Sequence, residues 1–97
     1  MTISLHRGVQ SDSAEFLRYY DEIGGRSLGD AFFEDLMARL TLIGDQPRRF
    51  PRWRGEIRRA NLTRFPCHLL FRIVGEQVRV LVVRHHRRHP EFGLSRR

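Results

Sequence analysis

Histidine and arginine are concentrated near the C-terminal end of the sequence, in the stretch RHHRRHP that runs from Arg84 to Pro90. Histidine titrates near neutral pH and can serve as a general acid or base. Arginine presents a planar fork of donors that matches phosphate and carboxylate groups. With Arg72 and Arg79 just upstream, this stretch combines side chains that can transfer protons with side chains that can bind an anion or an acidic partner.

A predicted β-hairpin must position these residues. Its strands, Cys67–Val74 and Gln77–Arg84, flank Gly75-Glu76, and glycine at the first position of a two-residue loop is typical of a type II′ turn. The resulting register places Arg72 opposite Arg79. It continues without interruption through these pairs: Phe71 with Val80, Leu70 with Leu81, Leu69 with Val82, and His68 with Val83.

Alternation of side chains gives this hairpin two different faces. The predicted core face carries Leu69, Phe71, Ile73, Val78, Val80 and Val82. The other face carries His68, Leu70, Arg72, Arg79, Leu81 and Val83, and we expect it to be left open. Like charges directly opposite each other are destabilising. Either an anion or acidic partner binds near the two arginines, or both side chains extend into solvent.

Two helices are predicted upstream of the hairpin. After a short strand, Thr2–His6, and a connector over residues 8–11, Asp12 and Glu15 form a capping-box pattern for a helix over residues 13–23. Gly24-Gly25 ends it. Ser27 is then predicted to cap a second helix that reaches Ile43, so that the two helices form an antiparallel hairpin.

The remaining segments complete an α+β prediction. Residues 46–55 are expected to form a loop pinned by Phe50 and Trp53, and residues 57–62 a strand before the hairpin. The predicted order is β-α-α-β-β-β in one domain, 1–97, with the helical hairpin packed on one face of an antiparallel sheet.

The composition restricts the possible partners and the compartment. All 18 basic residues are arginine, and with 11 acidic residues they give a net charge of +7. Such a protein typically binds nucleic acid, an acidic protein or an anionic surface, although a GC-rich genome alone also enriches arginine. Cys67 is the one cysteine, which excludes an internal disulfide and a cysteine-based zinc cluster, and we expect it to be buried and unreactive. With no signal-like or membrane-spanning segment and no cofactor motif, we expect a cytoplasmic protein without metal or cofactor.

Several segments resemble the RelE/ParE superfamily of toxins from type II toxin–antitoxin modules. The residues that carry the resemblance extend over nearly the whole chain: the region 16–20, the run 43–47 (IGDQP), Arg58-Arg59, Phe65-Pro66, Leu70-Phe71-Arg72, Gly75-Glu76, 80–83, and the ending His85, Arg88, Pro90 and Phe92. The combination, rather than any single motif, carries the likeness.

The resemblance implies a small basic toxin that is neutralised by an acidic antitoxin in a hetero-oligomer. It implies no membrane association. The residues it suggests for antitoxin binding are Tyr20, Phe33, Met37, Arg72 and Arg79. Members of the superfamily follow two branches, since RelE-like toxins cut messenger RNA on the ribosome and ParE-like toxins act on DNA gyrase and block replication.

Two absences favour the ParE-like branch. No tyrosine follows Tyr20 and the chain has no lysine, whereas RelE-like sites commonly use both. The alternative is an endoribonuclease whose site would comprise Arg59, Arg72, Arg79, His85 and Arg88, with His86 or His89 as further acid or base. His85 can equally have a structural role in packing the tail. A third alternative is a degenerate toxin that only binds its antitoxin.

Overall fold

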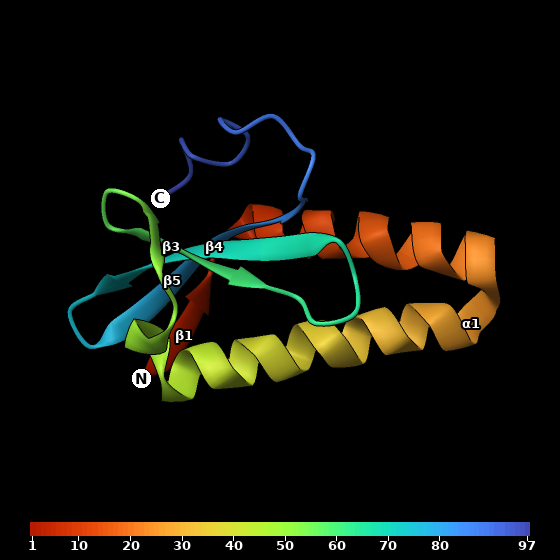
Figure 1. Cartoon of the computed structure of the whole chain (residues 1–97), viewed down its shortest axis with the longest axis horizontal. Helices are drawn as coiled ribbons and strands as arrows, with labels where there is room; N and C mark the ends of the chain where they lie inside the picture. The colour runs from red at the N-terminus through yellow and green to blue at the C-terminus, as the bar shows by residue number, and fades with distance from the viewer.

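The fold consists of a helical hairpin on one face of a five-stranded sheet. The computed structural model describes all 97 residues, Met1–Arg97, and has dimensions of about 40 × 27 × 22 Å (Figure 1). The elements in chain order are β1 (Thr2–Leu5), α1 (Arg7–Asp45), the 3-10 helix η1 (Pro47–Arg49), β2 (Arg52–Arg54), β3 (Ile57–Asn61), β4 (Cys67–Val74) and β5 (Gln77–His85). The predicted α+β class is confirmed.

The sheet has the order β1-β5-β4-β3-β2. Strand β1 pairs in parallel with β5, and Ile3 lies opposite Val78. All other neighbouring strands are antiparallel. The sheet is therefore mixed. Strand β2 lies within the segment predicted as a loop, where Phe50 is buried as expected.

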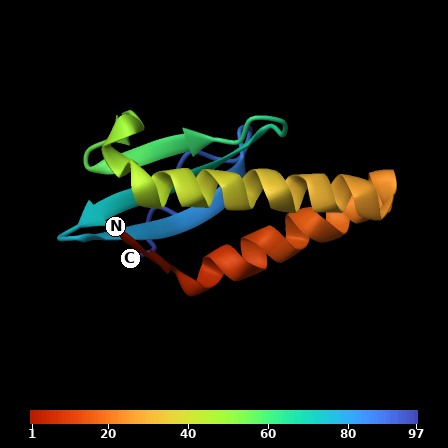
Figure 2. The same cartoon turned by 90° about the horizontal axis from the view of Figure 1, so that it is seen from below.

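Element α1 consists of two arms that lie side by side under the sheet (Figure 2). They cover residues 7–24 and 26–45 and meet at Gly25, whose φ of 76° and ψ of 179° are strongly unfavourable for any residue with a Cβ. The predicted hairpin of helices is thus confirmed. No side-chain cap is formed by Ser27, contrary to our prediction, because the second arm begins directly after Gly25.

The start of the first arm differs from the prediction. The helix begins at Arg7, and His6 caps it by accepting a hydrogen bond from the Gly8 N–H at Nδ1 (2.9 Å). The expected connector over residues 8–11 is therefore helical. Asp12 is buried inside the helix and its carboxylate bonds to other elements, so it cannot cap a helix that starts at residue 13.

The predicted hairpin is confirmed at its turn and wrong beyond it. A type II′ turn requires a positive φ at its first central residue only. Gly75 has a φ of 62°, and the φ of Glu76 is not positive. Arg72 lies opposite Arg79, as predicted. A bulge then inserts Leu81, so Leu70 faces Val82 instead. Val83 consequently joins the core under the helices, while Val82 turns to the opposite face, the reverse of our expectation.

The main core lies between α1 and the sheet. An aromatic cluster joins the two arms to the segment before β4, with ring centroids 4.7–5.5 Å apart among Phe16, Tyr20, Phe32 and Phe65. Buried Asp35 fixes the same segment, because its carboxylate accepts hydrogen bonds from Thr63 and from the Arg64 N–H. These contacts hold the start of β4 against the helices.

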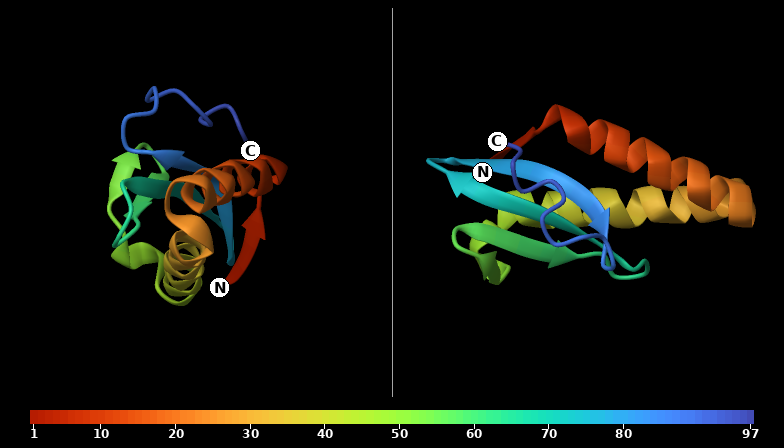
Figure 3. Two further views of the ribbon diagram at one scale, coloured as in Figure 1. Left: turned by 90° about the vertical axis from the view of Figure 1, so that its right-hand side faces the viewer. Right: turned by 90° about the horizontal axis from the view of Figure 1, so that it is seen from above.

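The opposite face of the sheet is not open, as had been predicted. The C-terminal tail, residues 86–97, crosses this face (Figure 3), and Phe92 and Leu94 pack with Trp53 over Leu70, Leu81 and Val82. The tail makes a second, smaller core there. None of the helices is of the length and apolarity needed to span a membrane.

Candidate functional site

Four side chains form a hydrogen-bonded chain at the end of β5. Arg84 donates from Nε to Nε2 of His68 (2.8 Å), and Nδ1 of His68 lies 2.9 Å from Nδ1 of His86. The imidazole rings of the two histidines are stacked, with centroids 5.1 Å apart. Arg59 completes the chain from β3, with its guanidinium 3.2 Å from the same His86 nitrogen. Arg59 and His86 are therefore brought together.

Arg84 determines the tautomers of both histidines. Because the guanidinium is always a donor, Nε2 of His68 must be the acceptor, which puts the proton of neutral His68 on Nδ1. That proton is donated to Nδ1 of His86, so neutral His86 carries its own proton on Nε2. Nδ1 of His86, the nitrogen without a proton, therefore already accepts a hydrogen bond.

His85 and His89 each receive a backbone hydrogen bond at Nδ1. The donors are the N–H of Arg87 (3.0 Å) and the N–H of Glu91 (3.1 Å). Each ring stabilises a turn of the tail, and each neutral ring therefore carries its proton on Nε2. This is the structural role considered for His85.

Desolvation and neighbouring positive charges disfavour protonation of buried His68 and of His86, which is exposed to solvent. Desolvation lowers the pKa of His68 to about 3, and the positive charges of Arg59 and Arg84 contribute to the shift. Desolvation also lowers the pKa of His86, again with a contribution from Arg59. The pair is held neutral for hydrogen bonding at neutral pH.

Arg84 also anchors the tail, a role that the sequence analysis missed. Its buried guanidinium donates to the carbonyl oxygens of His89, Pro90 and Phe92 and lies 4.9 Å from the ring centroid of Trp53. Arg84 lies near the end of strand β5, and the signal in the sequence was a charged residue directly after the apolar run 80–83.

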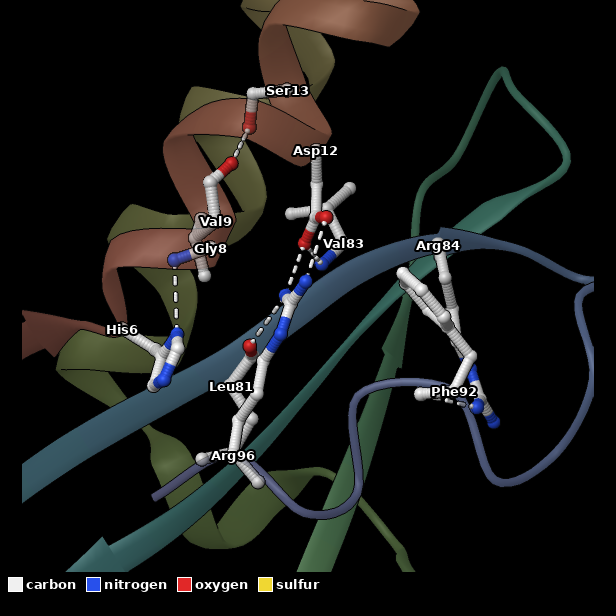
Figure 4. Close-up of polar contacts among 10 residues, drawn as sticks. All are labelled: His6, Gly8, Val9, Asp12, Ser13, Leu81, Val83, Arg84, Phe92 and Arg96. Carbon is white, nitrogen blue, oxygen red and sulfur yellow. Dashed lines mark hydrogen bonds and ion pairs between the residues drawn. The ribbon is translucent and has the colours of Figure 1, made fainter.

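A second anchor ties the end of the tail to the first helical arm (Figure 4). Arg96 donates to both carboxylate oxygens of Asp12, at 2.7 and 3.2 Å, and Asp12 also accepts the Val83 N–H at 3.1 Å. Arg96 further donates to the Leu81 carbonyl oxygen. The carboxylate thus satisfies backbone left unpaired beside the bulge and neutralises a tail arginine.

The arginines predicted to form one site are separated. Arg72 and Arg79 lie beside the turn of the hairpin, six residues along β5 from His85, which is about 20 Å at the rise of a strand. Arg59 faces the histidine end instead, and Arg88 lies over the ring of Phe92 at 4.0 Å. Arg88 and His85 do line one small cavity of about 190 Å³.

The remaining predicted binding residues lie on or near α1. Phe33 and Met37, one helical turn apart, are 48% and 44% exposed. Met37 lines a cavity of about 460 Å³ between the two arms, whose apolar walls are Leu5, Val9, Leu17, Leu36 and Leu40. Tyr20 is buried among the aromatic residues, so its exposed neighbour Tyr19 offers more surface to a partner.

The geometry indicates neither a reactive cysteine nor a metal site. Cys67 is buried as expected, and desolvation raises the pKa of its thiol to about 11, which keeps it protonated and unreactive. No three side chains of His, Cys, Asp or Glu are grouped so as to hold a metal ion.

The same architecture occurs in a solved toxin–antitoxin structure. A chain of the structure described as "Chromosomal ParDE TA system from P. aeruginosa" superposes with a TM-score of 0.78. This chain therefore has the fold of that ParDE chain. The match covers 88% of this chain and 95% of the other, at 16% sequence identity. No protein-family model and no curated protein matches the sequence.

Proposed function

We propose that this protein is the toxin of a type II toxin–antitoxin module, that it is ParE-like, and that it arrests growth by acting on DNA gyrase. The fold shared with a ParDE chain over nearly the full length of both supports the toxin assignment. The apolar cavity between the arms of α1 supports the presence of a protein partner. Since its proposed target acts on DNA, we place the toxin in the cytoplasm.

One observation carries the choice of branch. None of the tail histidines, His85, His86 and His89, has an unprotonated nitrogen free, because each Nδ1 already accepts a hydrogen bond. Cleavage of RNA needs a base to take the 2′-hydroxyl proton. The separation of Arg72 and Arg79 from this end of β5 also leaves the histidines without those two phosphate clamps.

The decisive experiment is metabolic pulse-labelling after induced expression without antitoxin, with thymidine and methionine incorporation followed in parallel. We expect DNA synthesis to stop first while translation continues. An early stop of translation would overturn the gyrase assignment. If neither process stops, the protein is a binding module or a decayed toxin.

The proposed antitoxin segment is an amphipathic helix that lies in the cavity between the arms. Phe33 and Met37 would contact its apolar face, and we expect Met37→Glu to weaken the complex by burying a charge there. Ala38→Glu, which adds the same charge at an exposed position outside this cavity, is the matched control. Equal binding by both variants would place the antitoxin elsewhere.

A ribonuclease remains the second candidate because Arg59 and His86 are in contact. In that case Arg59 would stabilise the charged phosphorane, and His86 would position the Arg59 guanidinium through its Nδ1 contact. Should translation stop first, Arg59→Ala and His86→Ala would relieve the arrest. Arg88→Ala, which removes a charge stacked on Phe92, provides the comparison.

A further inference from the structure

Charge is divided unevenly between the two parts of the chain. Residues 1–45, which contain α1, carry four arginines and eight acidic residues, a net charge of −4. Residues 46–97, which form most of the sheet and the tail, carry fourteen arginines and three acidic residues, a net charge of +11. A polyanion is therefore attracted to the sheet and the tail rather than to the helices.

A pocket lined by arginine lies beside the turn of the β4–β5 hairpin. It has a volume of about 270 Å³ and is lined by Arg72, Arg79 and Arg97 together with Val74 and Gln77. Arg79 is held by Ser4 Oγ at 2.6 Å and by the main-chain oxygen of Arg97 at 3.1 Å. Two of the three arginines face each other directly across the strands.

One buried donor of this pocket has no acceptor. The Nε–H of Arg72 is buried and has no hydrogen-bond partner, a state that costs free energy unless an acceptor arrives. None of the three ion pairs of the molecule involves a pocket arginine, and Glu76 in the adjacent turn pairs with none of them. No Asp or Glu side chain therefore neutralises the three arginines of this pocket.

We propose that this pocket binds a phosphate group of a nucleic-acid backbone. Arginine forks match the oxygens of phosphate, and three of them converge here. A second pocket on the same hairpin turn, lined by Arg48, Arg52 and Arg58 with one acid, Glu56, offers further positions along a repeating anion. Several cationic positions around one turn favour a phosphodiester chain over a single carboxylate. This site does not require gyrase as the target of the toxin. Arg72 and Arg79 were also expected to bind an antitoxin, and competition with an acidic polypeptide distinguishes that role from phosphate binding.

The test measures binding of the full-length protein to a fluorescein-labelled 12-nucleotide oligo(dT) by anisotropy across a salt series. We expect Arg72→Gln to weaken binding about fivefold at about 0.1 M salt, because each lost phosphate contact lowers the salt slope by about 0.7. Arg18→Gln removes the same charge from the first helical arm and should change neither quantity. Arg72→Lys keeps the charge and should keep the slope.

A second readout follows the Arg72 Nε–H signal by NMR during titration. We expect the oligonucleotide to shift this signal and to slow its exchange with water. Equal weakening by Arg72→Gln and Arg18→Gln, or an unmoved signal, would overturn the proposal. If only inorganic phosphate moves the signal, the ligand is a free phosphate. If poly-glutamate competes as well as the oligonucleotide at equal charge, the pocket binds an acidic protein instead.

Discussion

Two ion pairs of this protein hold the tail in very different environments. Asp12 and Arg96 are mostly buried, and the Asp12 carboxylate also accepts the Val83 N–H. Arg54 and Glu91 form an equally short pair, 2.7 Å, on the surface, with side chains 49% and 64% exposed. The equal distances alone would predict equal contributions of the two pairs to stability. Solvent screening weakens the exposed pair more than the buried one.

We expect Asp12→Ala to lower the free energy of unfolding by about 3 kcal/mol, because it leaves the Arg96 charge and the Val83 N–H without partners. Glu91→Ala, the corresponding change on the surface, should lower the free energy of unfolding much less, because solvent screens that pair. Urea denaturation of the two variants measures both values. Similar losses would contradict the difference in burial.

His68 links stability to pH. Its pKa is about 3 in the folded protein, mainly through desolvation, and about 6.5 in the unfolded chain, so the unfolded state binds more protons between these values. The contribution of neutral His68 is present above pH 6.5 and is lost as the pH falls toward 3. The slope from this one group reaches at most about 1.4 kcal/mol per pH unit.

We therefore expect His68→Gln, which preserves an acceptor for Arg84, to flatten the fall in stability between pH 6.5 and 3. Measurement of the urea midpoint at several pH values gives the slope. His89→Gln, which removes an exposed histidine, should leave it unchanged. A wild-type slope in His68→Gln would assign the acid sensitivity to another group.

The two helical arms are connected through the non-helical backbone of Gly25. The positive φ of Gly25 is rarely adopted by residues with a Cβ, although a Cβ at this position would meet no atom within 4 Å. We expect Gly25→Ala to destabilise the fold by about 1–3 kcal/mol through strain alone. Ser27→Ala should change stability by less than about 0.5 kcal/mol, since Ser27 makes no cap. Thermal unfolding distinguishes strain at Gly25 from a requirement for a cap at Ser27.

The sequence predicted elements where local chemistry decides them. Glycine signals located the turn at Gly75 and the break between the helices, and apolar alternation located both strands of the hairpin. The bulge at Leu81 was not predictable, because leucine there fits either register and the Asp12 carboxylate that accepts the Val83 N–H beside it is 71 residues away. The same distant use of Asp12 explains the misplaced helix start.

The grouping of the candidate site residues could not be predicted from the sequence. The sequence singled out arginines and histidines, but their separation into two groups follows from strand length and the direction of Arg59. His68 and Arg84 were missed as a pair because the bulge brings them into register. Phe92 and Leu94 are isolated apolar residues in a charged tail, too few to indicate a second core.

The division of charge makes the protein a dipole, with its positive end at the sheet and the tail. On a sulfonate cation-exchange resin at pH 7, we expect the sheet and tail to face the resin. Arg87→Gln should then elute at clearly lower salt than the wild type, and Arg18→Gln should shift by less than half as much. Both remove one exposed arginine. Equal shifts would contradict an oriented surface.

Parallel pairing of β1 with β5 has a consequence for synthesis of the protein. Thr2 lies opposite Gln77, so the first strand made must wait for the last before its edge of the sheet can form. At about 5–20 residues per second, this delay is about 4–15 s. Contacts so far apart in sequence also slow folding itself. The sheet of a nascent chain is therefore incomplete during most of translation. The surfaces that depend on the complete sheet form only after nearly all of the protein has been made.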